Sequence, residues 1–295
     1  MMRLAACLPL LALLAACSVA SSGPSADTAM VTPTSAGPVA DAGEAQPPVV
    51  EIAVDPAPAV EETPAAPTAS RIDLKYLIGD VDPASDPKFA RIPEKYIAGS
   101  RVWGHKDAVE AFVRMAEDAE QTGYKLKIVS AFRSFSDQKK IWEDKWTGKT
   151  LVGGKKLNTS LPDPQARALK ILQYSSMPGT SRHHWGPDFD FNSLDNAYFT
   201  TNRDGRRIYD WLVNHAANYG FCQVYTSKKG EGARTTGYEE EKWHWSYTPV
   251  AAWYQRQYPS DVGYERLTGF LGAETARAIG VIPGYVQGVN PECVQ

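Results

Sequence analysis

The chain has 295 residues, with 31 Lys and Arg against 34 Asp and Glu and a formal net charge of −3 at pH 7. From residue 71 onward the balance changes to 30 basic and 27 acidic side chains. This small excess is far from the clustered basic charge of nucleic-acid-binding domains, so no nucleic-acid partner is expected.

The first 17 residues predict export. Arg3 precedes an apolar run of about a dozen residues, which is too short for a permanent membrane span and is typical of a secretion signal. The run ends in Leu14-Ala15-Ala16-Cys17, which resembles the lipobox of bacterial lipoproteins. We therefore expect a lipid on Cys17 that anchors the chain to a membrane face of the cell envelope. The serine that follows favours the outer membrane by family analogy, and an ordinary signal with a chance cysteine is the alternative.

Residues 18–70 differ sharply in composition from the rest. They are rich in Pro, Ala, Ser, Thr and Val, with seven acidic residues and no Lys or Arg. Without a periodic apolar face, the segment cannot bury enough surface to offset the entropy lost on ordering. We expect a disordered tether that its prolines keep extended, with a reach on the order of 100 Å.

Residues 71–295 are aromatic-rich and of mixed charge, and their number suits one monomeric domain with a full core. Helical spacing and cap residues predict helices at 107–123, 137–146, 164–174 and 206–220. Strands are predicted at 124–134, 188–192 and 242–249, and a long exposed loop at 147–161. This order indicates an α+β fold, with a small, mainly antiparallel sheet and flanking helices.

Polar and apolar residues alternate in two of these strands. In "DFDFN", residues 188–192, the side chains of Asp188, Asp190 and Asn192 share one face. In "KWHWSYTP", residues 242–249, His244 and Ser246 lie opposite the aromatic residues. Each strand therefore presents one polar face.

These polar faces supply ligands for a metal. A catalytic zinc ion needs three nitrogen or oxygen ligands from the protein and one open position for water. His183 and Asp190 can supply two if the turn at residues 186–187 brings the preceding loop against the strand, and His244 can supply the third. Glu241, three residues before His244, is placed to accept a proton from the attacking water.

Three more side chains bear on this site. Arg133, at the end of the strand 124–134, can hold a carbonyl oxygen or a carboxylate through its planar guanidinium group. Asp188 is the only obvious fourth ligand, and four protein ligands would make the site structural. We expect Asp188 to face solvent or to lie just outside the ligands instead. His184 should point away from the metal, because it follows His183 directly on a segment expected to be extended.

Three stretches together resemble a known family. In order, "SAFRSFSDQ" (130–138), "SRHHWGPDFD" (181–190) and "EKWH" (241–244) look like the signature blocks of zinc D-alanyl-D-alanine carboxypeptidases of the VanY type. That family belongs with the lysostaphin-like peptidases and the hedgehog signalling domain. The resemblance spans residues 75–250 in outline, which is most of the predicted domain.

The resemblance implies a role for each matching residue. His183, Asp190 and His244 would bind Zn²⁺, Glu241 would be the general base, Arg133 would contact substrate, and Gln138 and Ser181 would assist in binding it. The sequence departs from the family pattern at Pro187-Asp188, where relatives usually carry small or apolar residues. That departure bears on substrate preference more than on the existence of the site.

The predicted function is removal of a C-terminal D-alanine from peptidoglycan stem peptides. L,D-carboxypeptidase and peptidoglycan endopeptidase activities are alternatives, because the choice depends on loops such as 147–161 and on residues 269–293. A non-catalytic cell-wall-binding lipoprotein is an alternative of another class. Glu241 argues against it, because binding alone does not need a base beside the metal.

The cysteines predict a disulfide. With Cys7 removed in the signal and Cys17 lipidated, Cys222 and Cys293 remain in an exported, oxidising setting, where we expect them to pair. Two separate buried thiols are the alternative, since the sequence does not give the distance between the two Cα atoms.

Overall fold

The computed structural model describes residues 71–230 and 233–295. The predicted signal segment 1–17, with the lipidation site Cys17, and the predicted tether 18–70 lie outside these residues. Of the helices in the described part, none combines the length and the apolar character that a bilayer span requires.

The described residues contain both helices and short strands. The helices are α1 (Leu74–Ile78), α2 (Lys106–Gln121), α3 (Phe135–Trp146), α4 (Leu157–Ser160), α5 (Pro164–Leu172), α6 (Asn196–Thr200), α7 (Arg203–His215) and α8 (Thr248–Asp261). The strands are β1 (Phe89–Arg91), β2 (Trp103–His105), β3 (Ile128–Ser130), β4 (Asp188–Phe191), β5 (Phe221–Gln223) and β6 (His244–Tyr247).

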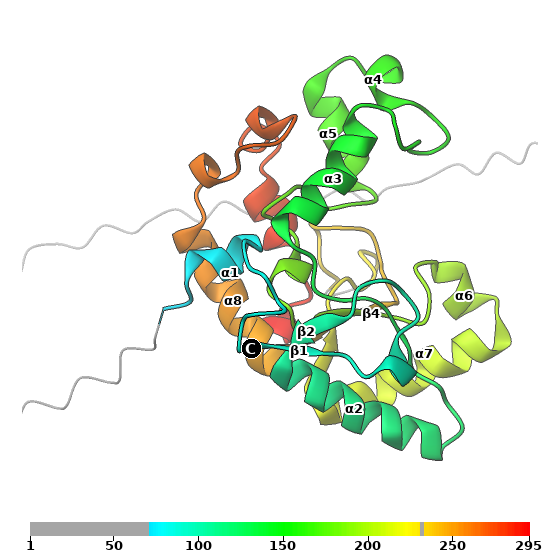
Figure 1. The fold of residues 1–295 in the computed structure, drawn as a ribbon. Helices are drawn as coiled ribbons and strands as arrows, with labels where there is room; N and C mark the ends of the chain where they lie inside the picture. The colour runs from blue at the N-terminus through cyan, green and yellow to red at the C-terminus, as the bar shows by residue number, and fades with distance from the viewer. Residues whose placement is uncertain (1–70, 231–232) are drawn as a thin grey trace, which may run out of the picture. The chain divides into compact units, whose positions relative to one another are not determined.

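The strands form two antiparallel sheets (Figure 1). β1 pairs with β2, and the larger sheet has four strands in the order β3-β4-β6-β5. In this larger sheet Asp190 lies opposite His244, and Asp188 lies opposite Ser246. The prediction of an α+β fold with a small antiparallel sheet and flanking helices is confirmed.

Aromatic side chains cover one face of the four-stranded sheet. Phe189 and Phe191 of β4, Phe221 of β5 and Trp245 of β6 are each at most 3 % exposed. They share a core with buried residues of α2 and α7, which lie toward the bottom of Figure 1. Because alternate residues of a strand point to the same side, the polar residues between them are directed to the other face.

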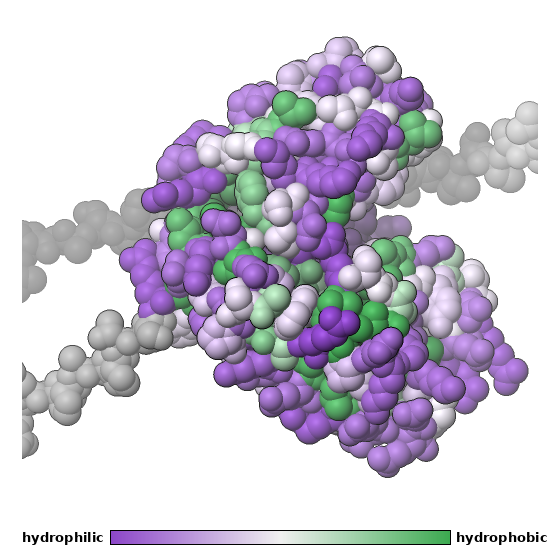
Figure 2. Space-filling model, viewed as in Figure 1, coloured by the Kyte–Doolittle hydropathy of each residue, from purple (hydrophilic) through white to green (hydrophobic). Residues whose placement is uncertain are grey.

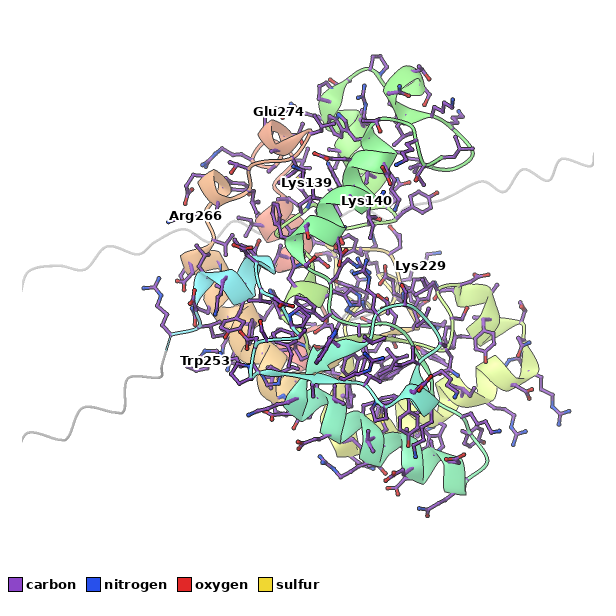
Figure 3. The ribbon with its side chains drawn as sticks, viewed as in Figure 1. Lys139, Lys140, Lys229, Trp253, Arg266 and Glu274 are labelled. Atoms are coloured by element: carbon purple, nitrogen blue, oxygen red, sulfur yellow. A yellow bond between two sulfur atoms is a disulfide. The ribbon has the colours of Figure 1, made fainter. Side chains whose placement is uncertain are left out.

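A second apolar cluster joins α3, α5 and α8 to the C-terminal residues. The indole Nε1 of Trp142 in α3 donates to the carbonyl oxygen of Leu271 at 2.8 Å, and its ring meets that of Phe270 edge-on. In Figure 3 the label Lys139 marks α3 and the label Glu274 marks the C-terminal stretch beside it. The C-terminal residues are therefore part of the folded domain.

Several predicted elements have different limits in the structure. The strand predicted at 124–134 is only β3, so Arg133 lies three residues beyond its end. The loop predicted at 147–161 includes the short helix α4. α7 begins earlier than predicted, because the side chain of Asn202 accepts hydrogen bonds from two backbone N–H groups and caps it. Asn192 leaves the strand face with a φ of 60° and bonds instead to the backbone at Lys125 and Lys127.

Cys222 of β5 and Cys293 form a disulfide, with their Cα atoms 5.5 Å apart. The bond joins two positions 71 residues apart in the sequence and fixes the end of the chain to the sheet edge.

Candidate metal centre

Three buried side chains converge from two strands and a turn. His183 lies in the 3₁₀ turn η2 (Arg182–His184), Asp190 in β4 and His244 in β6. Gly186 makes the turn possible: its φ is 93°, and a Cβ there would come within 2.7 Å of the Phe89 ring. The turn therefore brings η2 against the polar face of β4.

The distances between these side chains suit a metal. His183 Nε2 lies 3.3 Å from Asp190 Oδ2, and His244 Nδ1 lies 3.2 Å from Asp190 Oδ1. One ligand atom from each residue lies within 4.8 Å of the others. Tetrahedral zinc with bonds of about 2.0–2.1 Å separates its ligand atoms by about 3.3 Å. Each imidazole thus lies at about that distance from one oxygen of Asp190, although the two imidazoles approach different oxygens.

An unpaired buried oxygen supports the same fit. Asp190 Oδ1 is buried and makes no well-formed hydrogen bond among the described residues, although it faces His244 Nδ1. Burial alone would raise the pKa of Asp190, but the His183 and His244 rings that face its two oxygens hold it well below its usual range. Burial lowers the pKa of His183. An ionised carboxylate and a neutral imidazole are the forms that bind a cation.

His244 is held from behind by Asp188. Its Nε2 lies 2.8 Å from Asp188 Oδ2, so Nδ1 is the atom turned toward Asp190 and Glu241. Burial would lower the pKa of His244, but the carboxylates of Asp188 and Asp190, which face its two ring nitrogens, raise it to about 10. A metal and a proton would therefore compete for Nδ1. Asp188 is 0 % exposed, so the expectation that it might face solvent is wrong, and its place is just outside the ligands.

Glu241 lies beside the ligands at the floor of the cleft. Its Oε2 is 3.5 Å from His244 Nδ1, and its side chain keeps 26 % of its surface exposed. Burial raises the pKa of Glu241 to about 7, and the charge of His244 opposes that rise. A carboxylate with a pKa near the working pH is well suited to general acid and base catalysis.

Arg133, Gln138 and Ser181 lie together near this floor. Arg133 Nη1 donates to Gln138 Oε1 at 2.7 Å, and Gln138 Nε2 donates to the carbonyl oxygen of Ser176 at 2.6 Å. Gln138 is fully buried and is not among the cleft-lining residues, whereas Arg133 and Ser181 line the cleft. Gln138 is therefore placed to orient Arg133, and its predicted contact with substrate would have to be indirect.

The cleft above the ligands has a volume of about 430 Å³. One wall is formed by residues 173–176 after α5, and the other by residues 194–196 at the start of α6. Figure 2 shows the surface hollowed between the part with α3–α5 and the part with α6 and α7. Tyr225 and Tyr238 also line it, and Tyr238 has a buried hydroxyl without a partner in the described chain. Tyr238 was not among the residues predicted for the site, although it stands only three residues before Glu241.

His184 has a structural role. It lies in η2, not on an extended segment, and is fully buried. Its Nδ1 lies 2.6 Å from the carbonyl oxygen of Arg133, and its Nε2 accepts from the backbone N–H of Gly179 at 3.1 Å. Burial lowers the pKa of His184 to about 3, so the ring is neutral and joins two backbone segments beside the site.

Two curated proteins match this chain in sequence, each over about half of its own length. The chain is 30 % identical to "Putative carboxypeptidase YodJ" of Bacillus subtilis over 162 residues, which are 53 % of this chain and 48 % of that protein. It is 33 % identical to an uncharacterized protein of Haemophilus influenzae over 73 residues, 24 % of this chain and 50 % of that protein. The chain thus spans about half the length of the curated relatives it matches.

Similar solved structures include three peptidases. The LdcB LD-carboxypeptidase is 21 % identical, with a TM-score of 0.42 over 68 % of this chain and 80 % of that one. A mutant of the D,D-pentapeptidase VanY, solved with Zn(II), is 20 % identical, with a TM-score of 0.38 over 63 % and 93 %. DacB from Streptococcus pneumoniae is 25 % identical, with a TM-score of 0.35 over 61 % and 82 %.

A family model decides the membership. The model described as VanY, D-alanyl-D-alanine carboxypeptidase, matches residues 102–250, which is half of the chain. All three proposed metal ligands, Glu241 and Arg133 lie inside the matched region. The chain belongs to the VanY family of D-alanyl-D-alanine carboxypeptidases.

Proposed function

We propose that this protein is a zinc-dependent peptidase that removes a C-terminal D-alanine from peptidoglycan stem peptides. The observation that supports this most strongly is the convergence of His183, Asp190 and His244 beside Glu241 at the floor of one cleft. Three ligands and a neighbouring carboxylate are the arrangement of a hydrolytic metal site.

The protein's own groups then divide the chemistry. A zinc ion held by the three ligands would supply Lewis-acid activation of water and of the scissile carbonyl. Glu241 accepts the proton of the attacking water and returns it to the leaving amine as the peptide C–N bond breaks. Its pKa of about 7 suits both steps.

Unpaired hydrogen-bond donors in the cleft support binding of the C-terminal end of a peptide. Arg133 Nε, Ser181 Oγ and the Tyr238 hydroxyl are buried without partners among the residues described, and all three residues line the cleft. Buried polar groups in native proteins are nearly always hydrogen-bonded, so these three call for a ligand that accepts. The carboxylate and carbonyl oxygens of a peptide end meet that need.

The test is hydrolysis of muropeptides of defined length by the full chain with zinc, with products weighed by mass spectrometry. We expect loss of one terminal alanine from pentapeptides. Glu241→Ala should lower the rate by about 10²–10⁴-fold and leave zinc at one per chain. Glu110→Ala, which removes an exposed carboxylate of α2 that does not line the cleft, should leave the rate unchanged. Full activity of Glu241→Ala would overturn the mechanism.

The same products decide the cleavage specificity. Alanine released from tetrapeptides only would make the enzyme an L,D-carboxypeptidase, and a cut cross-link would make it an endopeptidase. Zinc binding without any hydrolysis would favour a wall-binding protein.

We further propose that the protein is exported and anchored through Cys17, since the sequence of residues 1–17 supports both. In a Gram-negative bacterial host we expect the wild type in the outer-membrane fraction and Cys17→Ala in the soluble periplasmic fraction. Equal distribution of the two would contradict the anchor.

A further inference from the structure

A group of buried polar side chains lies directly behind the ligand His244. Its members come from η2, β4, β6 and α8, and each is at most 2 % exposed. We call it the Asp188 cluster, and it consists of Arg182, Asp188, Ser246 and Gln255.

Asp188 is the centre of this cluster. Its Oδ2 accepts from Arg182 Nε at 2.7 Å and faces His244 Nε2 at 2.8 Å, while its Oδ1 accepts from Ser246 Oγ at 2.6 Å. Arg182 Nη2 also donates to Ser246 Oγ, at 2.9 Å. The carboxylate is thus bound on both oxygens, and one of its partners is the metal ligand.

The cluster continues into the C-terminal residues. Arg182 Nη1 donates to Gln255 Oε1, and Gln255 Nε2 donates to the carbonyl oxygen of Val286 at 2.8 Å. Gln255 and Val286 both lie beyond residue 250, where the family match ends. A continuous series of hydrogen bonds therefore runs from the C-terminal segment to His244.

The same segment supports the loop that leads to Glu241. The rings of Tyr285 and Tyr238 meet edge-on at 5.2 Å, and the backbone N–H of Asn290 donates to the carbonyl oxygen of Val224 at 2.8 Å. The backbones of Gly237 and Gly288 are in direct contact: a Cβ atom on Gly237 would lie only 1.8 Å from the carbonyl oxygen of Gly288. Residues 282–294 thus lie along the back of the site.

Stability alone does not account for the cluster. Removing two charges from water costs several kcal/mol each, and well-packed apolar residues often replace such pairs without loss of stability. What the pair does achieve is orientation: a carboxylate on one imidazole nitrogen fixes the ring and the tautomer, so the other nitrogen is presented to the metal.

We propose that Asp188 is the positioning residue for His244, and that Arg182, Gln255 and the Val286 carbonyl hold Asp188, so that the C-terminal segment contributes to metal affinity. This inference rests on the proposed metal site. It adds a part of the chain outside the family match to the determinants of that site.

The test is zinc affinity of the full chain, measured by competition with a chromophoric chelator. Asp188→Asn should weaken zinc binding by about 10–100-fold, the usual effect of losing an outer partner of a ligating histidine. The visible absorption bands of the cobalt(II)-substituted protein should shift, since the ligand field changes. Thr275→Val is the matched control, because Thr275 is buried and hydrogen-bonded to Gly272 but has no contact with the cluster. It should keep wild-type affinity and spectrum.

Gln255→Met tests the C-terminal link and serves if Asp188→Asn does not fold. We expect a zinc affinity lower by about 3–10-fold, less than for Asp188→Asn, because Gln255 acts through Arg182. Wild-type affinity and spectrum in the folded variants would overturn the inference. If the wild type itself bound no zinc, the proposed function would fail instead, so the two failures are distinguishable.

Discussion

On one face of the four-stranded sheet, Phe189, Phe191 and Trp245 pack against α2 and α7; on the other face, Asp190 and His244 meet the turn that contains His183. Both sets come from β4 and β6 and alternate along them. Burying a large apolar side chain contributes about 1.5–3 kcal/mol, whereas burying a polar one costs free energy unless it is paired. The apolar face therefore stabilises the domain, and the polar face depends on that stability to keep the metal-ligand side chains in place.

The largest effect is expected on the apolar face. Phe189 is fully buried and contacts the rings of Phe112, Phe191 and Phe221. Phe189→Ala should lower the free energy of unfolding by about 3–5 kcal/mol, because it leaves a cavity. Urea denaturation measures this, and each folded molecule should still bind one zinc ion. Val213→Ala, at an exposed position of α7, should change stability by no more than about 0.5 kcal/mol.

The converse change is made on the polar face. His183→Ala removes one of three ligands. A full structural zinc site binds its ion with a free energy of about 10–16 kcal/mol, so one ligand accounts for roughly 4 kcal/mol. We therefore expect zinc affinity to fall by about 1,000-fold. The circular dichroism spectrum should stay that of the wild type. Stoichiometric zinc in this variant would contradict the proposed ligand set. Unfolding would contradict the division between the two faces.

The disulfide gives the polar side a covalent support of its own. Cys222 lies opposite Ser246 in the sheet, so it is on the same face as the Asp188 cluster. Replacing both Cys222 and Cys293 by Ser should cost about 2–4 kcal/mol in the free energy of unfolding, a typical contribution of one disulfide. Adding reductant should destabilise the wild type by a similar amount and leave the double variant unaffected.

The smallest effect concerns Lys145, which donates to Ser175 at the cleft wall. Burial, with a smaller contribution from the charge of Arg133, lowers the pKa of Lys145 from 10.5 to about 8. Between these two pH values the unfolded chain keeps a proton that the folded chain has lost, so the free energy of unfolding rises with pH. Because the side chain is partly exposed, we expect a rise of about 1–2 kcal/mol.

Urea titrations at pH 7.5 and 10.5 measure this rise, and Lys145→Met should reduce it. Lys140→Met is the control, because Lys140 on the same helix pairs with Asp144 and its pKa is raised. An equal rise in wild type and Lys145→Met would show that burial of this lysine has no such cost.

Local patterns predicted much of the fold and of the candidate site. Alternation along β4 and β6 placed Asp190 and His244 on one face, and the spacing of Glu241 placed it beside them. Such features depend on residues close in sequence, where strand geometry is regular. The strand predicted at 124–134 was too long, because pairing with neighbouring strands, and not composition, decides where β3 begins and ends.

The environment of Asp188 could not be read in the same way. Its partners Arg182 and Ser246 lie 6 and 58 residues away, and Gln255 reaches the cluster from a position in α8 that lies beyond the family match. No periodicity in the chain relates these positions. The unpaired hydroxyl of Tyr238 was missed for the same reason, since only the folded cleft shows that it lacks a partner among the described residues.

The contact between Gly237 and Gly288 limits how this protein can change over evolution. A methyl group on Gly237 would collide with the carbonyl at 288, and one on Gly288 would come within 2.4 Å of the amide nitrogen at 237. No single second mutation relieves either collision, because both partners are main-chain atoms. Homologues that retain residues 282–294 should therefore keep glycine at both positions, and the φ of 89° at Gly237 favours glycine there even in homologues without that segment.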